Sequence, residues 1–249
     1  MDEKKASIIG AVATSAINLA TLSLPETTAG IFSAISPIVQ GAIERGLSTM
    51  GAARLSDREK HRIGSTVWWA TRVIEDNLRV GKNVMQSQID QERIDAFVES
   101  VFRAASEDAQ EKKDKAYGVF LGNFAFQDKF DGGALFTMAQ IIKELSLDEL
   151  LLIAALNGRP GMNYEEIFKK FEQDGDLRCG EMVGFFTRLR NLGLVIRVLP
   201  ISMASGIGCL KLSARGEALC DLAKLQEIDP EQYNSLRQYL DLFAKPAES

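Results

Sequence analysis

Carboxylates, one histidine and three cysteines are the side chains of this sequence that could carry chemistry. Neighbouring carboxylates can bind a divalent metal or act as acid and base, and the candidates are Glu107, Asp108, Glu111, Asp128 and Asp131. His61 is the only histidine, which removes most zinc sites and every mechanism that needs two imidazoles. Because no histidine ligands support the carboxylates, we predict no catalytic residue and no metal site.

Two further patterns that could indicate a binding site have simpler explanations. Gly206-Ile207-Gly208 lacks the third glycine and the strand-to-helix context of a dinucleotide fingerprint. The charged run from Glu107 to Lys115 has balanced signs at spacings of three and four, which predicts a solvated helix face. The sequence therefore predicts a protein that is not an enzyme and has no cofactor.

Length, charge and cysteine usage limit the class of protein. The chain has 249 residues, which is enough for two domains, and a formal net charge of -5, which argues against coating nucleic acid by charge. Cys179, Cys209 and Cys220 form no CxxC pair, and an odd number leaves one thiol unpaired, so we expect a reducing, cytoplasmic location. The first residues resemble a secretory signal, but the apolar stretch is too long and too polar for one.

An apolar N-terminal segment is the feature that most needs a partner. From Ala6 to Ile43 the only charged side chain is Glu26, and Leu24-Pro25-Glu26-Thr27 predicts a turn between two apolar helices within residues 1–50. This hairpin could be a buried helical pair, a reversible membrane-inserting or pore-forming element, or a self-association surface. Its candidate membrane or assembly residues are Ile8, Ile9, Gly10, Val12, Thr14, Ile17, Asn18, Ile31, Phe32, Ile35, Ile38 and Val39.

Residues 54–145 have the periodicity of a helical domain. A capping box at Ser56 and Glu59 opens a long helix that we expect to reach about Gln86. Further helices are expected after Asp90, from about residue 106 to 126, and around residues 135–145. Trp68 and Trp69 are adjacent and cannot both face one core, so one of them should be partly exposed.

The sequence patterns of residues 146–226 predict helices, then two strands, then a further helix. Three helices, a strand at 194–199, a returning strand at 209–212 and another helix are expected, followed by an amphipathic helix at 229–245. The phrases Leu189-Arg190-Asn191-Leu192-Gly193-Leu194-Val195 and Leu212-Ser213-Ala214-Arg215-Gly216 are similar to those of the winged-helix superfamily. The predicted fold class is therefore mainly α, with a helical hairpin and bundle followed by a winged-helix domain with a two-stranded β wing.

The charges of this domain do not identify its partner. The candidate contacts to nucleic acid or to a protein partner are Arg178, Arg188, Arg190, Arg197 and Lys211. Acidic residues of the same segment nearly cancel these cations, so we place a protein partner or a homo-oligomer ahead of nucleic acid.

One family resemblance covers about Glu107 to Leu222. The segments Tyr117–Ala125 and Ile141–Glu149, followed by the winged-helix phrases, resemble the bacterial family described as abortive infection protein alpha. The resemblance implies a role in antiphage defence and provides no catalytic residue. We therefore predict a non-enzymatic effector or effector subunit, switched by a partner or trigger, which is cytoplasmic and associates with the inner membrane on activation. The alternative is a winged-helix transcriptional regulator with a helical dimerisation domain.

Overall fold

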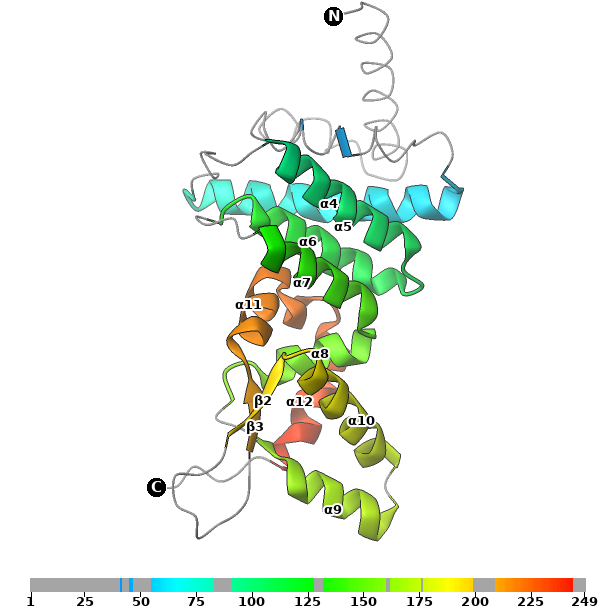
Figure 1. Cartoon of the computed structure of the whole chain (residues 1–249), viewed down its shortest axis with the longest axis vertical. Coiled ribbons are helices and arrows are strands. Elements are labelled where there is room, and N and C mark those ends of the chain that lie inside the picture. Colours follow the sequence, from blue (N-terminus) through cyan, green and yellow to red (C-terminus); the bar gives the residue numbers. More distant parts are fainter. Residues whose placement is uncertain are drawn as a thin grey trace, which may run out of the picture. The chain divides into compact units, whose positions relative to one another are not determined.

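A computed structural model of the chain describes residues 41, 45–46, 55–82, 91–127, 132–159, 162–175, 177–198 and 209–243. These residues are mainly helical and belong to two compact units, Met1–Glu144 and Leu145–Ser249 (Figure 1). The predicted membrane or assembly residues from Ile8 to Val39 lie outside the described residues, as do Asp128, Asp131 and the loop at 199–208.

The N-terminal unit contains a bundle of helices. Its described elements are α4 (Asp57–Arg79), α5 (Gln91–Glu107), the 3-10 helix η2 (Glu111–Lys113), α6 (Asp114–Phe124) and α7 (Gly132–Glu144). The expected capping box opens α4, where Ser56 Oγ accepts from the Glu59 amide and the Ser56 amide donates to the Glu59 carboxylate. This helix ends at Arg79 rather than near Gln86, and the chain turns at Gly81, whose φ of 79° favours glycine.

Helices α4 and α6 approach each other closely enough to require glycine. A Cβ at Gly118 would lie 2.5 Å from the Thr66 carbonyl oxygen, and a Cβ at Gly122 would lie 2.7 Å from that of Ala70. From the first contact to the second, the residue numbers increase on both helices, so α4 and α6 run parallel. Near their C-terminal ends, the side chain of Asn77 donates to that of Asn123 at 3.0 Å. Phe97 of α5 packs nearby in the core, with its ring centroid 4.6 Å from that of Phe124 and 5.8 Å from that of Phe120.

Trp68 and Trp69 are both half-buried on α4. Their ring centroids are 4.5 Å apart in an edge-to-face arrangement. Arg72 lies over the Trp68 ring, and Lys115 of α6 lies over the Trp69 ring. Each indole is therefore shielded by a cation and an aromatic neighbour, which stabilises partly exposed rings.

The charged run at 107–115 is not the solvated helix face that its spacing predicts. Helix α5 ends at Glu107, η2 follows, and Asp108, Lys113 and Asp114 are buried. The expected helix from residue 106 to 126 is therefore replaced by a turn and the shorter α6. The reason is that opposite charges in this turn pair with one another and with backbone groups, which lets them leave water.

The C-terminal unit consists of helices around a small sheet. Its elements are α8 (Leu147–Leu156), β1 (Met162–Asn163), α9 (Tyr164–Asp174), α10 (Leu177–Asn191), β2 (Val195–Val198), β3 (Cys209–Leu212), α11 (Ala214–Ala223), the 3-10 helix η3 (Leu225–Glu227) and α12 (Pro230–Asp241) (Figure 1). The antiparallel sheet has the order β1-β3-β2. Helix α8 is buried from Glu149 to Leu156 and forms the centre of the core, because its apolar residues cover all sides.

Ser213 and Gly216 fix the connection between β3 and α11. Ser213 Oγ donates to the Gly193 carbonyl at 2.6 Å and accepts from the Gly216 amide at 3.2 Å, while the Ser213 amide donates to Leu194 O at 2.9 Å. A Cβ on Gly216 would clash with that same Leu194 carbonyl. The serine and the glycine three residues later therefore hold the end of α10, the start of β2 and α11 together.

None of the described helices is both long enough and apolar enough to cross a bilayer.

Candidate functional site

The cations predicted to contact a partner all lie in the C-terminal unit and are exposed: Arg178, Arg188, Arg190, Arg197 and Lys211. The first three belong to α10, whose inward stripe consists of the buried residues Cys179, Met182, Phe186 and Leu189. With 3.6 residues per turn, Arg188 and Arg190 point about 200° apart around the helix. The arginines of α10 therefore do not share one face.

The stripe opposite the buried residues of α10 carries no net charge. It contains Leu177, Glu181, Gly184, Arg188 and Asn191, at spacings of three and four residues. Leu177 is 81% exposed, and a Cβ built on Gly184 meets no atom within 4 Å. This outer stripe of α10 is therefore open at Gly184, with Arg188 as its single cation and Glu181 as its single anion.

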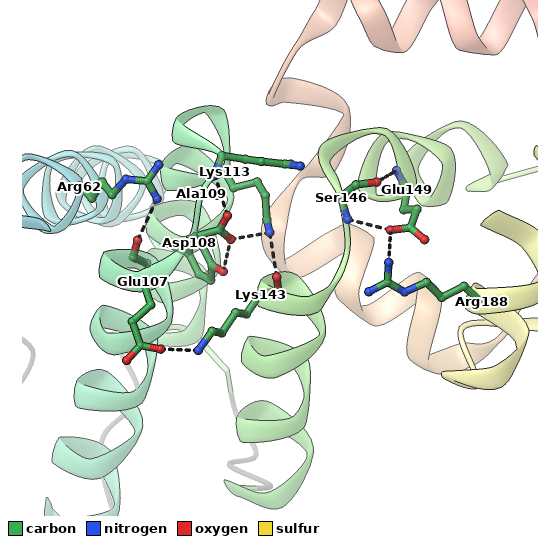
Figure 2. A network of polar contacts seen from close by, with 12 residues as sticks. Arg62, Glu107, Asp108, Ala109, Lys113, Lys143, Ser146, Glu149 and Arg188 are labelled. Atoms are coloured by element: carbon green, nitrogen blue, oxygen red, sulfur yellow. Dashed lines mark hydrogen bonds and ion pairs between the residues drawn. The ribbon is translucent and has the colours of Figure 1, made fainter. Parts of the chain in front are cut away.

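Arg188 is held by a buried carboxylate. Its Nη1 lies 3.2 Å from Glu149 Oε2, and Glu149 is only 2% exposed (Figure 2). The same oxygen accepts from the Ser146 amide at 2.7 Å, which closes the capping box of α8. Because a buried carboxylate is costly without a cation or hydrogen-bond donors, Arg188 has a structural role between α10 and α8.

Arg178 also interacts within the unit. Its guanidinium carbon lies 4.2 Å from the centroid of the Tyr239 ring, and the Tyr239 hydroxyl is 2.9 Å from the Cys179 sulfur. These contacts join the start of α10 to α12. Arg178 is thus engaged by an aromatic face of its own chain.

The two predicted wing cations lie on opposite faces of the sheet. Lys211 of β3 pairs with Ile196 of β2, whereas Arg197 pairs with Leu210. Residues directly opposite in an antiparallel pair share a face, and successive residues alternate. The structure therefore brings the five predicted cations into one unit, but does not gather them into one basic patch.

Sequence reasoning missed a buried charge cluster in the N-terminal unit. Lys113 is 1% exposed, forms an ion pair with Asp108, and donates to the Lys143 carbonyl at 3.1 Å (Figure 2). The Tyr117 hydroxyl donates to Asp108 at 2.8 Å. Burial, and then the charge of Asp108, raise the pKa of the Tyr117 hydroxyl. In the sequence, the one indication that this cluster is buried was Tyr117, an aromatic residue one helical turn after Lys113.

The cluster also reaches the adjoining surface of α5 and α7. Glu107, offered as a candidate carboxylate, pairs with the ammonium group of Lys143. Lys143 also lines a solvent-open groove of about 310 Å³ between α5 and α7. Its other lining residues are Ala96, Glu99, Ser100, Arg103, Ala104 and Gln140. Arg103 pairs with Glu99 at 2.7 Å. The charges around this groove are thus balanced within the unit, which favours a structural role.

The described residues contain no group of three or more histidine, cysteine or acidic side chains placed to hold a metal ion. Cys179, Cys209 and Cys220 form no disulfide within the described residues. Burial raises the pKa of Cys220 to about 11, with a smaller contribution from Asp221. A thiol with such a pKa is protonated at neutral pH and is a poor nucleophile.

No protein-family model, curated protein or solved structure matches the chain.

Proposed function

We propose that the C-terminal unit is a winged-helix domain and that it serves as an interaction module. The observation that supports this is the element order α8-β1-α9-α10-β2-β3 together with the sheet order β1-β3-β2. In such a domain α10 is the third helix, the one that DNA-binding members insert into the major groove. The outer stripe of α10 is then the surface that meets the partner.

The partner is a protein. Phosphate backbones are bound through clustered lysines and arginines, whereas the outer stripe has Glu181 beside its single arginine, and Arg188 is committed to Glu149. An exposed leucine and an open glycine suit close contact with another polypeptide, because glycine lets a backbone approach.

The role of the whole chain is that of a non-enzymatic effector in antiphage defence. The resemblance to abortive infection protein alpha supports the defence role, and the apolar segment within residues 1–50 supplies the output, by acting on a membrane or by self-assembly. The winged-helix domain receives the trigger or partner that controls this segment. The buried charges of the N-terminal unit and the thiols of the C-terminal unit are structural in this proposal.

The effector role is tested with the full chain and a variant lacking residues 2–50. We expect that only the full chain slows bacterial growth and floats with vesicles of mixed zwitterionic and anionic phospholipids. If it slows growth without floating, the segment acts by assembly, and the oligomeric state of the two proteins should then differ. Equal growth with both proteins would contradict the effector role.

A DNA-binding regulator is the second candidate. Arg190 and Lys211 favour it, because they are exposed cations of the third helix and of the wing. If the chain binds duplex DNA in this way, Arg190→Ala and Lys211→Ala should each weaken binding and reduce its salt dependence by about one charge. Arg237→Ala on α12 is the control for a cation outside this surface.

Fluorescence anisotropy with a labelled duplex distinguishes the two candidates. The protein-partner proposal predicts weak binding that is lost near physiological salt and is equal for the wild type, Arg190→Ala and Arg237→Ala. Tight binding that Arg190→Ala weakens and Arg237→Ala does not would favour the regulator.

A further inference from the structure

Three buried polar side chains near the contact between α4 and α6 have atoms that lack a hydrogen-bond partner among the described residues. Arg62 is fully buried, and within the described residues neither its Nε nor its Nη2 has a hydrogen-bond partner. The same holds for Thr66 Oγ1 and for Oδ1 of Asp114, which is 3% exposed. Arg62 and Asp114 lie one turn before Thr66 and Gly118, where the helix backbones touch. Buried groups of this kind are uncommon and need an explanation.

Asp114 faces charges of both signs. Arg62 of α4 is the nearby cation, while Asp108, from the turn after α5, and Glu111 of η2 are nearby anions. Lys113 of η2 is committed to Asp108 and to the Lys143 carbonyl of α7. Arg62 itself makes one long hydrogen bond, from Nη1 to the Ala105 carbonyl at 3.4 Å. Ionised Asp114 is repelled by Asp108 and Glu111, whereas protonated Asp114 loses its attraction to Arg62.

The balance of these effects brings the ionisation of Asp114 into the neutral range. Burial raises the pKa of the carboxyl, Arg62 lowers it, and Asp108 and Glu111 raise it, with a result of about 7. An unfolded aspartate has a pKa near 3.9. The folded unit therefore binds a proton that the unfolded chain releases, and the stabilisation that this proton provides is lost as the pH rises through about 7.

We propose that Arg62, Thr66 and Asp114 form a proton-sensitive contact between α4 and α6, closed when Asp114 is protonated and loosened when it ionises. The proton removes the repulsion from Asp108 and Glu111 and gives Asp114 a donor. Its loss leaves a buried carboxylate that Asp108 and Glu111 repel and that only Arg62, among the charges that act on it, attracts. Because α4 and α6 touch through backbone at Gly118 and Gly122, a small loosening at their N-terminal ends changes the exposure of both helices.

Amide hydrogen exchange of the full chain at pH 6 and pH 8 tests the contact. After correction for intrinsic exchange, we expect the opening constant of peptides from α4 and α6 to rise about tenfold over this interval. Asp114→Asn should remove the dependence, and Asp76→Asn, at a carboxylate that is 73% exposed, should keep it. Peptides of α12 serve as an internal control. A wild type without the dependence, or an Asp114→Asn variant that keeps it, would overturn the proposal.

A titration of the unmodified chain protects the test against a misfolded variant. The side-chain carboxyl carbon of Asp114, followed by carbon-13 NMR, should show a midpoint near 7. A midpoint below about 5 would mean that Asp114 is a carboxylate paired with Arg62, and would overturn the proposal.

Discussion

Gly216 and Gly184 are both helical glycines of the C-terminal unit, but their surroundings are opposite. A Cβ on Gly216 clashes with the Leu194 carbonyl, while a Cβ on Gly184 meets open space. The spacing of Ser213 and Gly216 could be recognised in the sequence as a family phrase. Its physical basis, a backbone contact with a residue more than twenty positions earlier, could not.

Replacement of each glycine by alanine should shift stability in opposite directions. Gly216→Ala should destabilise the C-terminal unit by about 1–3 kcal/mol, because the methyl group pushes α11 away from β2. Gly184→Ala should stabilise it by about 0.5–1 kcal/mol, because alanine is the better helix former. Urea unfolding followed by circular dichroism measures both. Equal effects of the two variants would contradict the close contact at Gly216.

The two capping boxes provide a second comparison between single residues. Glu59 caps α4 at an exposed position, whereas Glu149 caps α8 in the core and also holds Arg188. Glu59→Ala should cost little, because Ser56 remains as the cap and water can replace the carboxylate as acceptor for the Ser56 amide. Glu149→Ala should cost about 2–4 kcal/mol, because it removes a buried side chain that accepts from the Ser146 amide and pairs with Arg188.

Thermal unfolding of these capping variants measures the difference. Similar losses of stability would show that the Arg188 contact contributes little, and would return Arg188 to the set of cations available to a partner.

At the scale of elements, the helices were predictable because their apolar periodicity and caps are local signals. Ser56, Ser146 and Ser213 each begin a helix as their sequence patterns predict. The two-residue β1 was missed, since a strand that short has no periodicity. The turn at 108–113 was mistaken for a helix because balanced charges can pair on a surface or in a core, and only tertiary contacts distinguish the two.

The contact between α4 and α6 depends on small residues at two successive turns. Gly118→Ala and Gly122→Ala should each destabilise the N-terminal unit by more than about 1 kcal/mol, because the added methyl group meets backbone of α4 that cannot rotate away. Hydrogen exchange of peptides from α4 and α6 localises the effect. Unchanged protection in both helices would contradict the close approach.

At the scale of the whole molecule, each unit has its own buried core. We expect Gly118→Ala to weaken protection in residues 57–144 and Gly216→Ala to weaken it in residues 147–241, each leaving the other unit nearly unchanged. Hydrogen exchange over the full chain measures both responses. If either variant weakens protection evenly across the two ranges, the units unfold as one.

The composition of the apolar N-terminal segment does not distinguish between its possible environments. A hydrophobic hairpin has the same composition whether it enters a bilayer, a core or an assembly. The five predicted cations show the corresponding limit for the C-terminal unit. Their number could be read from the sequence, but the alternation of Arg197 and Lys211 across the sheet depends on strand register.

The most direct test of the account is a pair of charge variants on the outer stripe of α10, Gly184→Arg and Gly184→Glu. Open space at this position lets both side chains be accommodated. If a protein partner covers the stripe, both variants should abolish the slowed growth caused by the full chain, and neither should gain affinity for duplex DNA. Loss of the growth effect with glutamate alone, with tighter DNA binding by the arginine variant, would contradict a protein partner.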